Sequence, residues 1–140
     1  MTRLVIDASI AIKWVVEEEG TEAALALRKE AELIAPDLVI AECANILWKK
    51  VQRDELSESE ALIAARLLQS ANVEIFATRS LLEMATRLAI ELGHPAYDCI
   101  YLALAMQDDC RFATADRAFV RKISSAPHAD RVVALADIRP

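Results

Sequence analysis

The chain has 140 residues, of which 55% are hydrophobic and 27% charged, and its formal net charge at pH 7 is −6. This composition excludes an intrinsically disordered chain, and the low content of glycine and proline (2 and 4 residues) favours a helix-rich globule. No apolar run approaches the roughly 20 residues that a membrane-spanning helix needs, and the first residues lack a signal-peptide pattern. The length predicts a single domain over residues 1–140.

The charge and the cysteines narrow the class of protein further. Cys43, Cys99 and Cys110 cannot all pair within one chain and show no C-x-x-C spacing, so we expect reduced thiols in a cytoplasmic protein. The negative net charge argues only weakly against a nucleic-acid partner, because a partner responds to the local potential. Basic residues gather at 49–53 and 117–122, although solvated helix faces have the same composition.

The first third of the chain alternates between strand and helix patterns. Residues 4–6 are apolar and β-branched, as in a strand that is covered on both faces. Asp7 and Ser9 then introduce AIKWVV (residues 11–16), which predicts a first helix, and residues 21–30 predict a second. Residues 32–35 predict a second strand that stops at Pro36.

The middle of the chain contains three predicted helices and one strand. A helix over 37–53, with Pro36 suited to its first turn, is apolar nearly all round in its first half, so it is either central or part of an interface. Two S-x-x-E capping boxes, at 57–60 and 80–83, open further helices. Between them, residues 73–76 predict a third strand.

The last third completes the pattern. Gly93 and Pro95 end one helix and lead to Asp98, where we expect the most buried helix, because residues 100–106 are apolar on every face. Residues 111–114 and 131–135 predict the fourth and fifth strands. Strands separated by helices predict an α/β fold with a short parallel sheet of about five strands and helices on both faces.

Four isolated acids stand against apolar runs that should be buried. Asp7, Glu42, Asp98 and Asp116 lie in LVIDAS, LVIAECAN, PAYDCIYLALA and FATADRAF. Burying an ionised carboxylate is costly unless a cation or hydrogen-bond donors meet it. Four such acids in separate segments therefore suggest carboxylates that are gathered around a hard metal ion.

The predicted sheet gives these acids a common location. Asp7 follows the first strand and Asp116 the fourth, and ligands of open parallel sheets bind beyond the carboxyl ends of the strands. Asp98 stands at a helix start, where the helix dipole favours an anion. Glu42 shares a helix face with Asn45 and Lys49. An all-oxygen site of this kind suits Mg²⁺ or Mn²⁺.

Simpler explanations exist for three of the acids. Asp7, Asp98 and Asp116 each stand where a helix cap is expected, whereas Glu42 lies within a helix and has no capping role. Zinc is disfavoured, because the two histidines and the cysteines have no ligand spacing. We expect both histidines to be badly placed for the site.

The motifs that contain the acids resemble a known family, the PIN-domain ribonucleases, and specifically the VapC-type toxins of toxin–antitoxin pairs. The matching segments are LVIDASIAIKW, PDLVIAECANILWK, YDCIYLALA and FATADRAF, which occur in the family's order and span most of the chain. The late Y-D-x-x-Y-x-A-L-A followed by T-x-D is the most specific of them.

The resemblance implies a function and a set of site residues. It implies a Mg²⁺/Mn²⁺-dependent endoribonuclease with Asp7, Glu42, Asp98 and Asp116 as its acidic metal site and catalytic centre. Supporting positions, which contact the ligands and not the metal, would be Ser9, Asn45 and Thr114. It also implies an RNA substrate, a small antitoxin that blocks the site, and a homodimer. Arg117 and Lys49 are our candidates for RNA contact.

Two other functions fit the sequence less well. A Mg²⁺-dependent phosphatase with an aspartyl nucleophile would need a second aspartate where Ser9 stands. A catalytically silent PIN-like domain that binds RNA or protein would gain little from clustered negative charge.

Overall fold

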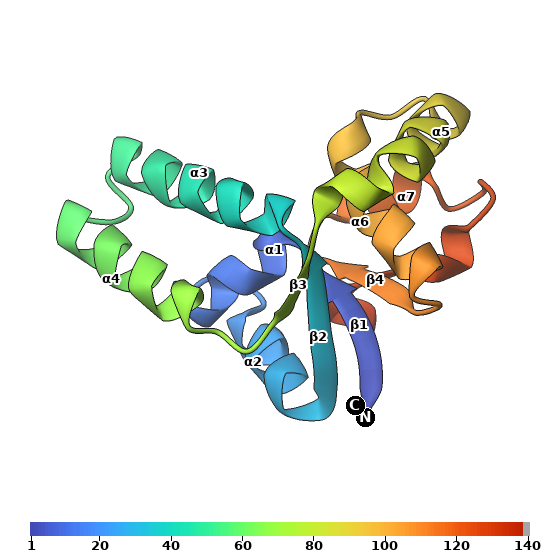
Figure 1. The fold of residues 1–140 in the computed structure, drawn as a ribbon. Coiled ribbons are helices and arrows are strands. Elements are labelled where there is room, and N and C mark those ends of the chain that lie inside the picture. Colours follow the sequence, from blue (N-terminus) through green and yellow to red (C-terminus); the bar gives the residue numbers. More distant parts are fainter. Residues whose placement is uncertain (139–140) are drawn as a thin grey trace.

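Five parallel strands form one sheet, in the order β3-β2-β1-β4-β5, in the computed structural model, which describes residues 1–138 (Figure 1). The strands are β1 (Thr2–Ile6), β2 (Ala31–Pro36), β3 (Glu74–Phe76), β4 (Arg111–Thr114) and β5 (Val132–Ala134). All five predicted strands are confirmed, with bounds that differ by at most two residues.

The helices lie on both sides of this sheet, so the predicted fold class is confirmed (Figure 1). They are α1 (Ala8–Ala11), α2 (Thr21–Glu30), α3 (Leu38–Gln52), α4 (Glu58–Gln69), α5 (Leu82–Leu92), α6 (Ala96–Gln107) and α7 (Arg117–Lys122). The helix predicted over 11–16 is wrong in its bounds, because α1 begins at Ala8 and a 3₁₀ turn (Ile12–Trp14) follows it. Helices α1 to α4 occupy one side, and α5 to α7 occupy the other. Within residues 1–138, no helix is long and apolar enough to cross a membrane.

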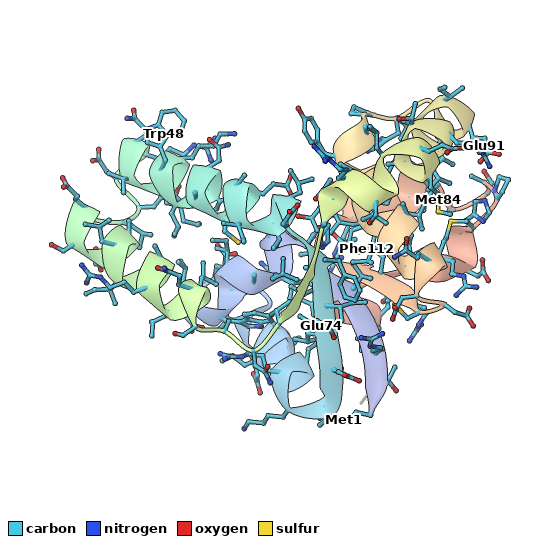
Figure 2. All side chains as sticks on the ribbon, in the orientation of Figure 1. Met1, Trp48, Glu74, Met84, Glu91 and Phe112 are labelled. Carbon is cyan, nitrogen blue, oxygen red and sulfur yellow. The ribbon has the colours of Figure 1, made fainter. Side chains whose placement is uncertain are left out.

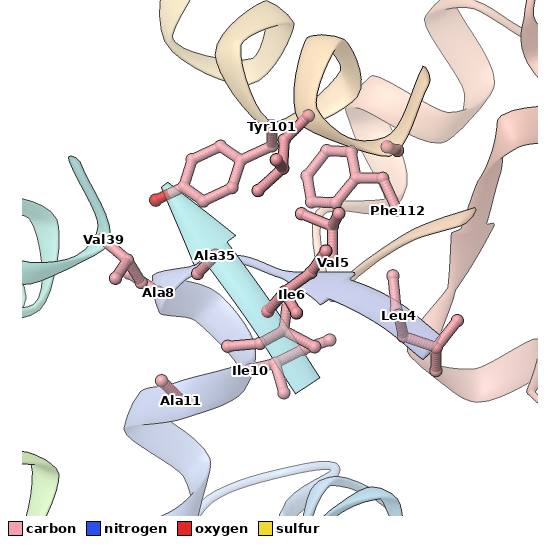
Figure 3. Close-up of a cluster of buried hydrophobic side chains, with 14 of the residues drawn as sticks. Leu4, Val5, Ile6, Ala8, Ile10, Ala11, Ala35, Val39, Tyr101 and Phe112 are labelled. Atoms are coloured by element: carbon pink, nitrogen blue, oxygen red, sulfur yellow. The ribbon is translucent and has the colours of Figure 1, made fainter. Parts of the chain in front are cut away.

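Helix α6 is the most buried helix, as the apolar run 100–106 predicts. It packs across β1, β2 and β4, and its side chains from Tyr101 to Ala105 are at most 1% exposed. The Tyr101 ring stacks on Phe112 of β4, with 5.3 Å between ring centroids (Figure 3). A helix that is buried on nearly every face can direct polar side chains only toward specific partners, and it therefore holds them in place.

Strand β1 lies at the centre of the sheet, and its register positions the functional residues. Ile6, the last residue of β1, pairs with Ala113 of β4. The residues that follow Ile6 and Ala113, namely Asp7 and Thr114, therefore lie side by side at the carboxyl end of the sheet.

Pro36 does not lie in the first turn of α3, which corrects the prediction. It is the last residue of β2 and pairs with Phe76 of β3, and Asp37 stands before the helix. A proline has no N–H to donate, and here the ladder bond comes from the next residue: Asp37 N donates to Phe76 O at 2.8 Å.

The two predicted capping boxes have different outcomes. Ser57 and Glu60 form the complete reciprocal pair at the start of α4, with distances of 2.8 and 3.1 Å. The box expected at Ser80 is wrong, because Ser80 lies inside a 3₁₀ turn (Thr78–Leu81) and its hydroxyl donates back to Ala77 O. Asp37 accepts from the Thr78 hydroxyl and backbone N–H, so this turn is tied to the start of α3 instead.

Helix α3 is a surface helix and not a central one. It buries only Val39, Cys43 and Leu47, which share one face, whereas Ile40 and Trp48 are 61% and 56% exposed. Figure 2 shows Trp48 on the far half of the helix, away from the sheet. Of the two options that its apolar first half left open, the exposed apolar side chains favour an interface.

The capping box of α4 supports a stability prediction. Ser57→Ala removes the acceptor for the Glu60 N–H, and we expect the free energy of unfolding to fall by about 1 kcal/mol in urea titrations. Ser59→Ala, in the first turn of the same helix, is the matched control and should change the free energy of unfolding little. An equal loss in both variants would contradict a capping role for Ser57.

Candidate active site

Asp7 is held at the end of β1 by two hydroxyl groups. The Ser9 hydroxyl donates to Asp7 Oδ1 at 2.5 Å, and the Thr114 hydroxyl donates to Asp7 Oδ2 at 2.6 Å. Each hydroxyl in turn accepts a backbone N–H, from Ala115 and Asp116 respectively, both at 3.0 Å. These amide donors leave each hydroxyl proton free to point at the carboxylate. Asp7 is also the N-cap of α1, as the simpler explanation predicted, because its Oδ1 accepts the Ile10 N–H at 3.4 Å.

The Asp7 carboxylate is only 6% exposed, and its environment penalises ionisation. Burial is the main cause that raises the pKa of Asp7 to about 6; the hydroxyl hydrogen bonds oppose this rise, and the charge of Asp98 adds to it. Asp7 has no lysine or arginine partner among the described residues. A buried carboxylate with a raised pKa and no cationic partner marks a candidate functional site.

Glu42 faces the same end of the sheet from α3. Its Oε1 accepts the hydroxyl hydrogen bond of Tyr101, which reaches across from α6. Figure 3 shows the Tyr101 hydroxyl directed toward the α3 side, where Val39 lies. Burial raises the pKa of Glu42, the Tyr101 hydrogen bond lowers it, and the charge of Asp98 raises it again.

Asp98 lies in the first turn of α6, with Pro95 and not Asp98 at the capping position. Its Oδ2 is 2.7 Å from His94 Nε2. Its charge acts on both Asp7 and Glu42, which shows that the three carboxylates share one electrostatic neighbourhood.

Asp116 combines two positions of interest. Its side chain caps α7 by accepting the Phe119 N–H at 3.2 Å, as the simpler explanation predicted. Its own N–H donates to the Thr114 hydroxyl that supports Asp7. The segment that ends β4 therefore joins Asp116 to the hydrogen-bond network around Asp7.

The other predicted site residues make no polar contact with this network among the described residues. Asn45, Lys49 and Arg117 are exposed, and among residues 1–138 no hydrogen bond or ion pair joins them to the acids. In the same range, no group of three or more histidine, cysteine or acidic side chains is already arranged to hold a metal ion. Each acid is instead turned toward its own donor.

The sequence analysis missed two neighbours of the acids, Tyr101 and His94, and also Lys122, which contacts His94. A lone tyrosine within the apolar run 100–106 could have been recognised, because a buried phenol hydroxyl needs a partner. The prediction that the histidines are badly placed is wrong for His94, which contacts Asp98. Lys122 contacts the far side of the same ring, a tertiary contact over 28 residues for which the sequence holds no signal.

The cysteines beside the acids are not candidate ligands. Burial raises the pKa of the Cys43 thiol to about 12 and that of Cys99 to about 11. Both are therefore neutral thiols at physiological pH, and they pack in the core. The atoms that remain available to coordinate a metal ion are carboxylate and hydroxyl oxygens.

Comparisons with known proteins assign the family. The sequence pattern of the family described as PIN domain matches residues 4–123, a range that contains all four acids. Ribonuclease VapC3 of Pyrobaculum aerophilum is 34% identical over 126 residues, which cover 86% of this chain and 94% of that protein. The chain therefore belongs to the PIN domain family and, within it, to the VapC group.

Solved structures agree with this fold. The protein PAE2754 from Pyrobaculum aerophilum superposes with a TM-score of 0.72 at 21% identity, covering 96% of this chain and 90% of that one. VapBC2 from Rickettsia felis, solved bound to a DNA fragment from its promoter, gives a TM-score of 0.67 at 14% identity, with coverages of 95% and 98%.

The raised pKa of Asp7 predicts how its charge affects stability. In metal-free protein at pH 7.5, Asp7→Asn should raise the free energy of unfolding by about 1–3 kcal/mol, because it removes a buried, ionised group whose pKa is about 6 instead of about 3.9. The raised pKa means that the folded state holds this proton more tightly. The stabilisation that proton binding at Asp7 gives to the folded state is complete below about pH 4, and it is lost as the pH rises through 6.

Urea titrations at pH 4 and pH 7.5 in the presence of chelator measure this effect. The advantage of Asp7→Asn should be large at pH 7.5 and small at pH 4. Asp116→Asn makes the same chemical change at an exposed cap and should show no such pH-dependent gain. An advantage of Asp7→Asn that does not depend on pH would contradict the assignment.

Proposed function

We propose that the protein is an endoribonuclease that depends on Mg²⁺, with Mn²⁺ as a substitute, and that acts as the toxin of a VapBC-type pair in the cytoplasm. Two observations support the proposal: Asp7 is buried without a lysine or arginine partner among the described residues and the charge of Asp98 raises its pKa and that of Glu42, and the chain is 34% identical to a ribonuclease. The three unpaired thiols support the cytoplasmic location.

The atoms of the site that could coordinate a metal fit a hard divalent cation. They are oxygens, and the charge of Asp98 raises the pKa of both Asp7 and Glu42, a repulsion that a cation would relieve. The side chains that touch Asp7 and Glu42 are neutral hydroxyl donors, which orient the carboxylates but leave their charge uncompensated. Because no three of the described acids already surround one point, we infer that some ligands act through water.

The chain's own residues then have separate roles. Asp7, Glu42 and Asp98 would hold the ion, and Asp116 would complete or orient the site from the network around Thr114. A divalent ion supplies, when bound, an activated water for in-line attack on phosphorus and stabilises the charge of the leaving oxygen. Ser9 and Thr114 keep the Asp7 carboxylate at a fixed rotation throughout. Among residues 1–138 no hydrogen bond or ion pair supports a role for Asn45 here, and its role stays a prediction from the resemblance.

RNA would bind across the acidic edge through exposed cations around it. Arg117 follows Asp116 at the start of α7, and Lys49 lies on α3, so the two candidates flank the acids from different sides of the sheet. Contacts of this kind reach phosphates and not bases, and they weaken with added salt.

Protein partners are the remaining part of the proposal. We infer a small cognate antitoxin and a homodimer, as the VapC group implies. The exposed apolar side chains of α3 and α4, namely Ile40, Trp48, Leu62, Ile63 and Leu67, offer area for such contacts.

Light scattering on the purified chain should give the mass of two copies, and the mass of a single chain at micromolar concentration would contradict the homodimer.

The central experiment is RNA cleavage by the purified chain. A mixed pool of single-stranded and transfer RNAs should be cut with Mn²⁺ or Mg²⁺ and not with chelator. Asp98→Asn should lower the rate by at least about 100-fold, because it removes a metal-binding charge at nearly constant shape.

Asp54→Asn is the matched control, since it makes the same change at an exposed acid beyond the far end of α3. It should cut like the unmodified chain. Full activity of folded Asp98→Asn would contradict the site assignment. Absence of cutting with either metal, by folded protein free of partner, would favour a PIN-like domain that only binds RNA or protein.

A further inference from the structure

His94 lies between two charged side chains. Its Nε2 is 2.7 Å from Asp98 Oδ2, and its Nδ1 is 3.0 Å from Lys122 Nζ. Lys122 Nζ also donates to Gly93 O at 2.9 Å, so the ammonium group is held by two acceptors on consecutive residues. The segment Gly93–His94 and the end of α7 are thereby joined next to the candidate active site.

The lysine determines which nitrogen of the ring carries the proton. An ammonium group has donors only, so a hydrogen bond to His94 requires a lone pair on Nδ1. The proton of the neutral ring must then be on Nε2, which donates it to Asp98. His94 is therefore a neutral donor to Asp98, in the same way that the Tyr101 hydroxyl is a neutral donor to Glu42.

The ring itself is held firmly. The His94 side chain is 15% exposed, and its ring packs on Phe119 of α7 with 4.8 Å between centroids. Gly93 adopts a left-handed conformation (φ 59°) that ends α5 and turns the chain toward this position. Backbone, ring packing and both nitrogens all restrict the same side chain.

We propose that His94 is a positioning residue for Asp98, and that Lys122 fixes the tautomer that makes this possible. The inference rests on the proposed metal site. Donation to Oδ2 sets the rotation of the Asp98 carboxylate and leaves Oδ1 without a partner among the described residues. The donor is neutral, so the full negative charge of Asp98 remains available to a cation, whereas a lysine placed directly on Asp98 would neutralise it.

Two amide substitutions separate this role from a general structural one. His94→Gln places its amide nitrogen near the position of Nε2 and can still donate to Asp98. His94→Asn places its amide nitrogen near the position of Nδ1 and cannot reach. Both variants lose the ring contact with Phe119, so any cost of lost packing is shared.

Calorimetric titration of the full chain with Mn²⁺ measures the effect without relying on catalysis. We expect His94→Asn to weaken Mn²⁺ binding by about 10- to 100-fold and His94→Gln to bind nearly as well as the unmodified chain. RNA cleavage at limiting Mn²⁺ should follow the same order, and saturating Mn²⁺ should restore much of the rate of His94→Asn. Unfolding temperatures of the two variants should be alike. If His94→Asn does not fold, His94→Phe keeps the ring packing without the donor and should show the same loss.

The outcomes distinguish this inference from the proposed function. If the unmodified chain binds Mn²⁺ no better than Asp98→Asn, the metal site fails and the inference fails with it. If Asp98→Asn loses binding but His94→Asn does not, only the inference is overturned. Equal losses in His94→Asn and His94→Gln would also overturn it, because the donor to Asp98 would then not matter.

Discussion

The structure depends on one unfavourable arrangement, a carboxylate buried at the end of the central strand. Asp7 follows β1, and the parallel register with β4 places the Thr114 hydroxyl against one of its oxygens. The Ser9 hydroxyl meets the other oxygen. Burial still raises the pKa to about 6, so the hydroxyl groups orient the charge without compensating it fully. An ionised Asp7 is therefore costly to the metal-free protein, and a cation at this edge would recover that cost.

The hydrogen-bond donors that contact the acids are all uncharged groups. Hydroxyl groups serve Asp7, a phenol serves Glu42, and a neutral imidazole serves Asp98. Lysine and arginine side chains form ion pairs elsewhere in the structure. Arg3 contacts Glu32, Glu74 and Asp108 at the opposite end of the sheet, and both Lys13 and Lys50 contact Glu18. These ion pairs therefore lie apart from Asp7 and Glu42, whose charges no lysine or arginine among the described residues compensates.

Helix α6 joins the fold to the site. It is the most buried helix, it carries Asp98 in its first turn, and one turn later it sends the Tyr101 hydroxyl to Glu42 on α3. The acids come from elements on both sides of the sheet, and α6 contacts three of the strands between them. A displacement of α6 would therefore disturb both packing and site geometry, which explains why its polar side chains have defined partners.

The fold class, the five strands and the buried helix could be predicted from the sequence, and four acids could be singled out, because these features depend on local patterns of apolar residues and on charges that interrupt them. It misjudged Pro36 and Ser80, where a neighbouring strand or turn overrode the local preference. The hydrogen-bond donor that each acid meets could not be predicted, because it comes from the way distant segments pack together. His94 meets Lys122 across 28 residues, and Tyr101 meets Glu42 across 59. Such pairs depend on how helices pack against the sheet, and no local pattern in the chain records that packing.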